Sequence, residues 1–238
     1  MIQAHAILLA AGKGARLKSR RSKPLVEVGG RPLVWYSLNV LQALPTLSEI
    51  VLVANTGNRR SLSSLVRKWG FTKVRSVVLG GRQRSDSVRC GLKALSPRAQ
   101  IVLIHDAARP FIDGALATRL IHSAQRYGAA IPGVPVKATI KKVKSKKAKG
   151  KSTLWVKETV DRHGLWEIQT PQVFKRDLLV EAFATCGRAP VTDDAMLVER
   201  IGRPVAVVEG SYANIKITTP EDIAVARAFA GSGIGTRQ

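Results

Sequence analysis

A glycine-rich loop near the amino terminus carries the residues best suited to chemistry in this chain. Gly12 and Gly14 follow the apolar run 6–9, which predicts a buried strand that opens directly into the loop. Glycines let the backbone adopt positive φ and approach a ligand closely, so successive N–H groups can hold a phosphate. Five cations follow within eight residues: Arg16, Lys18, Arg20, Arg21 and Lys23. The pattern predicts a polyphosphate site, with a solvated basic turn as the alternative.

The spacing of the glycines excludes two common phosphate loops. A P-loop requires Gly-x-x-x-x-Gly-Lys followed by Ser or Thr, and the sequence contains no such stretch. A dinucleotide-binding loop requires a third glycine or alanine where Leu17 stands. It also requires an acidic residue after the next strand, where this chain has Ala54 and Asn55. A glycine turn followed by arginine and lysine suits a triphosphate that is attacked during a reaction.

Asp106 is a second candidate for chemistry, because it directly follows the apolar run 100–105. An ionised carboxylate at the end of a buried strand needs a cationic partner or a metal ion. Mg²⁺ takes carboxylate and phosphate oxygens together, so we expect a magnesium site at Asp106. A turn-forming aspartate is the alternative. We expect His105 to be structural, since its spacing matches no metal-ligand cluster.

Lys216 lies within the apolar stretch 213–217, which predicts a strand. A lysine between buried neighbours is unusual, and a phosphate partner would account for it. A lysine that protects the edge of a sheet is the alternative.

Alternating strands and helices position these residues. The patterns predict strands over 6–9, 49–54, 74–79, 100–105, 129–136 and 205–209. They predict helices over 32–43, 58–69, 112–127, 176–185 and 193–200, another capped by Ser85 or Asp86, and one starting at Thr219. We expect Thr192 to cap the helix over 193–200, and the tail 231–238 to fray. This alternation predicts a Rossmann-like α/β fold, whose mainly parallel sheet is sandwiched by helices and binds ligands at the carboxyl ends of its strands.

A β-arm is predicted to protrude from this sheet at about 137–162. Its strands are expected over 136–140 and 153–159, around the lysine-rich turn 141–151. A disordered basic loop is the favoured interpretation of 144–151.

The composition predicts a single domain over 1–238, because 238 residues with 45% hydrophobic side chains can bury a substantial core. No apolar run approaches the ~20 residues that cross a bilayer, and the first strand begins too early for a secretory signal. Two distant cysteines, Cys90 and Cys186, do not suggest a disulfide framework. We expect a cytoplasmic enzyme, or one in an organelle stroma if a transit peptide has been removed.

The net charge of +23 raises the question of nucleic-acid binding. Nine lysines fall within 137–157 with no acid among them, and the remaining surplus is spread along the chain. Aromatic residues make up only 5% of the chain, and no helix-turn-helix, zinc-finger or RNP-type motif is present. Nucleic acid is therefore not the favoured partner. An anionic substrate accounts for part of the surplus.

The glycine loop resembles the signature of nucleotidyltransferases that join a nucleoside triphosphate to a sugar or polyol phosphate. Within that group the chain is most similar to the 2-C-methyl-D-erythritol 4-phosphate cytidylyltransferase family. The segments that carry the resemblance are 6–25, 80–88, 105–111, 159–166, 169–172, 192–194 and 214–218. They occur in order over almost the whole chain, and their combination is specific.

The resemblance implies transfer of CMP from CTP to 2-C-methyl-D-erythritol 4-phosphate, with release of pyrophosphate, in the non-mevalonate route to isoprenoid precursors. It implies Mg²⁺ as cofactor and a homodimer formed through the β-arm. The implied catalytic residues are Arg16, Lys23 and Lys216. The implied nucleotide-binding residues are Ala10, Ala11, Gly12, Gly14, Gly81, Ser87, Asp106 and Ala107. The implied contacts to the polyol phosphate are Asp106, Arg109, Thr139, Arg162 and Thr170, with Arg162 serving the neighbouring subunit.

Three positions depart from the family pattern. Ser22-Lys23-Pro24 stands where the family writes Pro-Lys-Gln, so Arg20 and Arg21 are considered as stand-ins. Arg82 replaces an acidic or polar residue, and Ala138 replaces the aspartate of an Asp-Thr pair. Another acceptor such as ribitol 5-phosphate, and a basic nucleic-acid-binding protein, stay open as alternatives.

Overall fold

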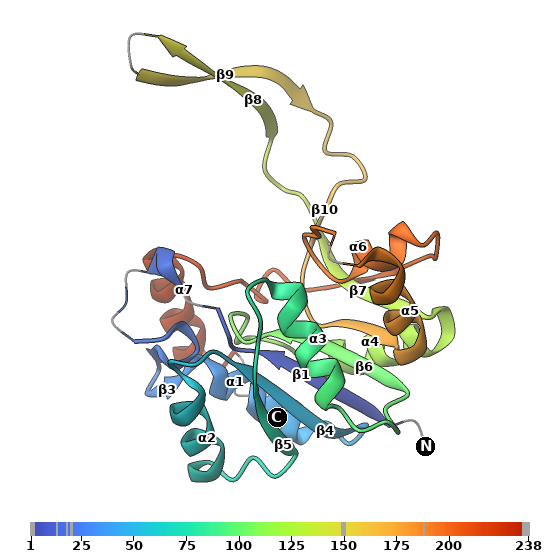
Figure 1. Ribbon diagram of the computed structural model, residues 1–238. Coiled ribbons are helices and arrows are strands. Elements are labelled where there is room, and N and C mark those ends of the chain that lie inside the picture. Colours follow the sequence, from blue (N-terminus) through green and yellow to red (C-terminus); the bar gives the residue numbers. More distant parts are fainter. Residues whose placement is uncertain are drawn as a thin grey trace.

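An eight-stranded twisted sheet forms the centre of the protein in the computed structural model, which describes residues 3–12, 14–17, 19, 21–148, 151–187 and 189–234 (Figure 1). Its main path is β10-β7-β11-β6-β1-β4-β5, and β12 also pairs with β7. The strands are β1 (Ala4–Leu9), β4 (Leu47–Ala54), β5 (Val74–Leu79), β6 (Ile101–Asp106), β7 (Ala129–Pro135), β10 (Trp166–Ile168), β11 (Gln172–Lys175) and β12 (Ala206–Glu209). Strands β6, β1, β4 and β5 are parallel neighbours, as the sequence predicts.

Helices cover both faces of this sheet, because successive side chains of a strand point to opposite faces. Ala6 and Leu8 of β1 pack with α1 (Leu33–Ala43), α2 (Arg59–Lys68) and α4 (Gly114–Tyr127). Ile7 packs on the other face with α3 (Arg84–Ala94), α5 (Arg176–Cys186) and α6 (Ala195–Arg200). The expected sandwich of helices around a mainly parallel sheet is confirmed.

A third apolar cluster joins the two ends of the chain. Leu17 comes from the glycine-loop region, and Val28 from a small hairpin of β2 (Glu27–Val28) and β3 (Arg31–Pro32). Both pack with Ile217 and with α7 (Pro220–Gly231). Helix α7 begins at Pro220 after Thr219, whose backbone N–H donates to the Asp222 carboxylate at 2.8 Å. The predicted start of this helix is confirmed. The C-terminal segment is thereby held against the N-terminal loop.

Two short strands escape sequence-based prediction and make the sheet mixed. β11 lies between β6 and β7 and runs antiparallel to both, and β10 runs antiparallel to β7. The strand predicted over 213–217 is wrong. That segment forms no strand, and the Ile217 N–H donates to the Ala108 carbonyl at 2.8 Å. Ile217 is buried in the third apolar cluster and the partly buried Ile215 packs against it, so packing rather than sheet formation holds this segment.

Two predicted helix starts are also wrong. Helix α3 is capped by Gln83, whose N–H donates to the Asp86 carboxylate at 3.1 Å, so neither Ser85 nor Asp86 is the cap. Helix α6 starts at Ala195 after Asp194 rather than after Thr192. In both cases several polar residues precede the apolar stripe, and the stripe alone does not select the cap.

The β-arm is a two-stranded ribbon that projects clear of the sheet (Figure 1). Its strands are β8 (Ile140–Ala148) and β9 (Lys151–Val160), paired antiparallel. The interpretation of 144–151 as a disordered loop is wrong for 144–148 and Lys151, because cross-strand pairs such as Ser145 with Leu154 extend the ladder to its end. Residues 149–150 and 235–238, including most of the tail expected to fray, lie outside the described residues.

No helix in the described part of the chain combines the length and hydropathy needed to cross a bilayer. Cys90 and Cys186 are both free thiols.

Candidate active site

A cleft of about 810 Å³ lies at the carboxyl ends of β1, β4, β5 and β6. This is the edge at which parallel α/β sheets bind ligands, and the volume suits a nucleotide. The predicted residues that line the cleft are Ala10, Ala11, Gly12, Lys23, Gly81, Ser87, Asp106, Ala107 and Lys216. The structure therefore brings together residues from both ends of the chain and from two loops between them.

Asp106 lies at the bottom of the cleft with a cation on each of its carboxylate oxygens. Lys216 Nζ is 2.7 Å from Oδ2, and Arg84 Nε is 3.1 Å from Oδ1. Burial alone would raise the pKa of Asp106, but these two charges outweigh burial and hold its pKa well below the usual range. The carboxylate is therefore ionised. A buried aspartate requires a cationic partner, and Asp106 has two, Lys216 and Arg84.

Lys23 faces the same wall of the cleft, from the short helix Lys23–Leu25. Its pKa is lowered, first by burial and then by the charge of Lys216, while Asp106 partly offsets both. A desolvated ammonium next to a second ammonium is stabilised by an anion placed between them. The two lysines thus place two positive charges close together in the cleft.

The glycine loop is shaped to bring Lys23 close. Gly14 has φ of +67°, and a Cβ added there would lie 2.7 Å from Lys23 Cβ. Any other residue at position 14 would push Lys23 away. Arg16 is exposed on the neighbouring short helix Ala15–Leu17 and its charge reaches Lys23. Gly14 and Arg16 do not line the cleft itself.

The departure at Ser22-Lys23-Pro24 is accommodated by a buried asparagine. Asn58 Nδ2 donates to Ser22 Oγ and to the Ala10 carbonyl, both at 2.9 Å. The lysine loop is thus fixed to the end of β1. Arg21 forms an exposed ion pair with Glu27 at 2.5 Å and does not line the cleft, so the suggestion that it replaces Lys23 is wrong. Lys18 and Arg20 lie outside the described residues.

Asn55 and Asn58 fix the backbone of the cleft, and the sequence analysis did not single them out for this role. Each side-chain oxygen accepts a backbone N–H from the other residue, at 2.9 and 3.0 Å, and Asn55 Nδ2 donates to the Ala11 carbonyl at 2.9 Å. The pair fixes the backbone of the glycine loop. The spacing Asn-x-x-Asn directly after a buried strand is the signal that could have found it.

The turn before α3 forms the opposite wall. A Cβ at Gly80 would lie 2.5 Å from Ser87 Oγ, and one at Gly81 would lie 2.3 Å from Asp86 Cβ. Ser87 Oγ donates to the Gln83 carbonyl at 3.2 Å. Both glycines are therefore required by packing, and they leave backbone groups facing the cleft. Arg82, the second departure, is exposed at the rim.

His105 and Thr170 support Asp106 from behind. Thr170 Oγ1 accepts the Asp106 N–H at 3.2 Å and lies 2.9 Å from His105 Nδ1, while His105 Nε2 lies 3.0 Å from the Arg109 carbonyl. Burial lowers the pKa of His105 to about 4, so the ring is neutral at pH 7. The prediction that His105 is structural is confirmed. Thr170 is buried and holds the backbone of Asp106 rather than lining the cleft.

The other implied contacts to the polyol phosphate do not meet within one chain. Arg109 Nη1 donates to the Asn214 carbonyl at 2.7 Å, which directs its guanidinium under the crossing segment. Thr139 and Arg162 are exposed at the base of the arm, where the Arg162 guanidinium donates to the Lys137 carbonyl. Neither Thr139 nor Arg162 is among the residues that line the cleft.

Among the described residues, no group of three or more His, Cys, Asp and Glu side chains is arranged to hold a metal ion. Asp106 is the only carboxylate of the described chain that lines the cleft. A divalent ion bound there would need phosphate oxygens and water as its other ligands, which is the usual coordination of Mg²⁺ in nucleotide enzymes.

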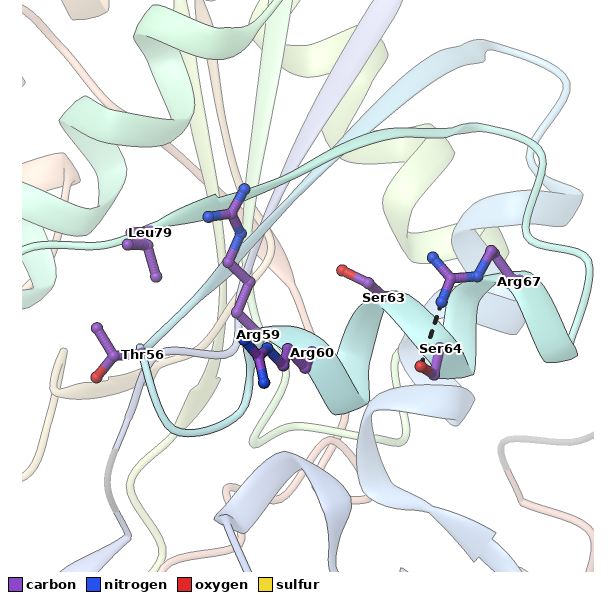
Figure 2. A pocket seen from close by; sticks show the side chains of 7 residues that line it. All are labelled: Thr56, Arg59, Arg60, Ser63, Ser64, Arg67 and Leu79. Carbon is purple, nitrogen blue, oxygen red and sulfur yellow. Dashed lines mark hydrogen bonds between the residues drawn. The ribbon is translucent and has the colours of Figure 1, made fainter.

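A second, arginine-lined groove of about 590 Å³ runs along α2 (Figure 2). Figure 2 shows Arg59 and Arg60 at the start of the helix and Arg67, bonded to Ser64, near its end. Thr56 and Leu79 line both this groove and the cleft, so the two are contiguous. Within the described residues these arginines form no ion pair with a carboxylate, and they add positive charge beside the cleft.

The fold and the cleft define a nucleotidyltransferase of the α/β class, with a glycine loop and converging cations at the carboxyl edge of a mainly parallel sheet. The family model described as 2-C-methyl-D-erythritol 4-phosphate cytidylyltransferase matches residues 4–232. The chain belongs to this family.

Relatives and solved structures agree with this assignment. The chain is 44% identical to the 2-C-methyl-D-erythritol 4-phosphate cytidylyltransferase of Geobacillus kaustophilus, over 95% of this chain and 96% of that protein. Its structure is similar to that of 4-diphosphocytidyl-2C-methyl-D-erythritol synthase from Anaerococcus prevotii, with a TM-score of 0.81, 32% identity and coverage of 97% and 96% of the two chains. The Thermus thermophilus cytidylyltransferase gives a TM-score of 0.75 at 33% identity, covering 95% of this chain and 98% of that chain.

Proposed function

We propose that this protein transfers CMP from CTP to the phosphate of 2-C-methyl-D-erythritol 4-phosphate and releases pyrophosphate, in the route to isoprenoid precursors. One observation carries the proposal: Lys23 and Lys216 converge on the ionised Asp106 beside the glycine loop. Two lysines that share one carboxylate, next to the backbone of the glycine loop, suit a bound triphosphate.

In the reaction, an oxygen of the acceptor phosphate forms a bond to the α-phosphorus of CTP. The bond from this phosphorus to the α,β-bridging oxygen breaks, and pyrophosphate leaves with the electron pair. Negative charge grows on the oxygens around the phosphorus, so the residues act by positioning and electrostatic stabilisation. Lys23 and Lys216 supply positive charge inside the cleft that offsets this negative charge. The exposed Arg16 can close over the triphosphate from the rim.

Mg²⁺ fits the proposed site through Asp106, whose lowered pKa keeps it ionised and available as a ligand. When bound, the ion would neutralise part of the triphosphate charge and hold phosphate oxygens in a fixed geometry. Lys216 is half-exposed, and within the described residues its side chain is bonded to Asp106 alone, so it is able to turn from the carboxylate to a phosphate.

We propose that the enzyme is a homodimer whose arms each contact the other subunit. Val143, Leu154 and Val156 have relative exposures of 49%, 67% and 61%, and cross-strand pairing places them on one face of the ribbon. An isolated two-stranded ribbon is marginally stable in water, and burial of this face against a second copy would stabilise it. The same contact would bring Thr139 and Arg162 to the neighbouring cleft.

Pyrophosphate release from CTP and Mg²⁺, measured separately with 2-C-methyl-D-erythritol 4-phosphate and with ribitol 5-phosphate, tests the proposal. We expect release with the first acceptor and little with the second. Preference for ribitol 5-phosphate would overturn the assigned acceptor. Absence of release with either, together with salt-sensitive binding to duplex DNA, would favour a nucleic-acid-binding protein. Both substrates are water-soluble anions, so we expect the enzyme to work in the cytoplasm, or in an organelle stroma after removal of a transit peptide.

A further inference from the structure

Arg84 lies between two carboxylates at the edge of the cleft. Its Nε is 3.1 Å from Asp106 Oδ1, and its Nη1 is 2.7 Å from Asp194 Oδ2. The Arg84 side chain is 29% exposed, while that of Asp194 is fully buried. An arginine guanidinium stays protonated in proteins, and here it contacts both carboxylates at once. The guanidinium is therefore a permanent positive charge that links Asp106 in the cleft to the buried Asp194.

Asp194 is itself held by the sheet. Gln172 Oε1 accepts the backbone N–H groups of Asp194 and Ala195, at 3.0 and 3.2 Å, and Gln172 Nε2 donates to Asp193 Oδ2 at 2.7 Å. Gln172 belongs to β11 and pairs in register with Ile104 of β6, the strand that ends in Asp106. The contacts form a closed frame from β6 through β11, α6 and α3 back to Asp106.

We infer that Arg84 is a positioning residue for Asp106, and that Asp194 keeps Arg84 in that role. The inference rests on the proposed function. Arg84 is bonded to two carboxylates and cannot follow a phosphate, whereas the Lys216 side chain, which bonds to Asp106 alone in the described part of the chain, can. Arg84 thus keeps the orientation of the Asp106 carboxylate when Lys216 turns to the triphosphate. Without Asp194, the guanidinium would be free to swing into the cleft and bind phosphate itself.

Stability alone does not account for this arrangement. Buried charges are expensive to desolvate, and well-packed apolar side chains commonly do as well or better. Arg84 Nη2 and Asp194 Oδ1 are buried and have no hydrogen-bond partner within the described structure, so the pair is incompletely satisfied. A polar contact that is incompletely satisfied and reaches the cleft residue Asp106 indicates a role in orienting that residue.

The test is a double-mutant cycle of Arg84→Met, Asp194→Asn and both together, with three readouts. Pyrophosphate release gives kcat, calorimetric titration with CTP and Mg²⁺ gives the stoichiometry and affinity of nucleotide binding, and a melting curve gives stability. We expect each single variant to lower kcat per bound CTP by roughly tenfold to a hundredfold, the range found when partners that orient a ligating side chain are removed. The double variant should be no slower than Arg84→Met.

Arg89→Met is the matched control. Arg89 lies on the same helix, where its guanidinium donates to the Phe183 and Gly187 carbonyls and stacks 4.6 Å from the Phe183 ring centre, joining α3 to α5 away from the cleft. This variant should lower the melting temperature and leave kcat per bound CTP unchanged.

Two results would overturn the inference. One is multiplicative loss in the double variant, which means that the residues act independently. The other is a loss of activity matched by a loss of CTP-binding stoichiometry, which means that the variants are only misfolded. A wild-type protein that releases no pyrophosphate would instead overturn the proposed function, so the two failures are distinguishable.

Discussion

Replacement of Lys216 by alanine should separate catalysis from stability. Lys216 Nζ donates to Asp106 Oδ2 at 2.7 Å, and its side chain is 46% exposed. Removal of one well-placed charged donor from a phosphoryl-transfer site costs about 3 kcal/mol in the transition state, which is a hundredfold or more in rate. A half-exposed ion pair contributes at most about 1 kcal/mol to folding, because solvent screens it, and Arg84 still pairs with Asp106 in the variant.

The expected result is thus a kcat reduced at least a hundredfold and a melting temperature lowered by no more than ~4 °C, the shift that about 1 kcal/mol produces in a domain of this size. Pyrophosphate release and a thermal melt measure the two quantities on one preparation. Lys93→Ala, an exposed lysine in the last turn of α3, serves as the control and should change neither. A rate within threefold of wild type would refute the catalytic role, and a collapse of the melting temperature would make Lys216 a structural residue.

Three further predictions follow from contacts described above. Gly14→Ala should weaken CTP binding measured by calorimetry, because the added Cβ at φ of +67° would lie 2.7 Å from Lys23 Cβ; unchanged affinity would contradict this reading of the loop. His105 has a folded pKa of about 4, below its unfolded value of about 6.5, so its neutral form stabilises the fold above pH 6.5 and this contribution is lost as pH falls toward 4. Melting temperatures at pH 7 and pH 5 should therefore differ less in His105→Gln than in wild type, and an equal difference would exclude His105 as the source. Leu154→Glu should shift the mass measured by light scattering from dimer to monomer and reduce activity, whereas a wild-type monomer would dismiss the dimer at once.

The parts of the site next to strands in the sequence could be predicted, because an apolar run fixes where a strand ends. Gly12, Gly81 and Asp106 each follow such a run and meet at one edge of the sheet. Their meeting follows from parallel topology alone. The alternation of strands and helices was sufficient to predict the parallel part of the sheet and the edge at which these residues lie.

The remaining parts depend on tertiary contacts that leave no local pattern. Arg84 and Asp194 are 110 positions apart, and the sequence around either residue does not indicate that the two form a contact. β11 is only four residues long and enters the sheet antiparallel between two longer strands, which periodicity cannot reveal. The strand prediction over 213–217 is wrong because an apolar pattern indicates only that residues are buried. Here the burial of Ile217 comes from packing against α7.

The route by which Lys216 reaches the cleft has a consequence for how the enzyme is made. Every strand of the described sheet ends by Glu209, so Lys216 and α7 follow the last strand in the chain. The lysine is then secured by the Ile217 N–H on the Ala108 carbonyl and by the Asp222 carboxylate, which accepts the Thr218 N–H at 2.6 Å. A chain that ends before Lys216 therefore lacks one of the two lysines that line the cleft. A product truncated after Glu209 would be an inert scaffold, and a tag fused at the carboxyl terminus is safest behind an intact α7.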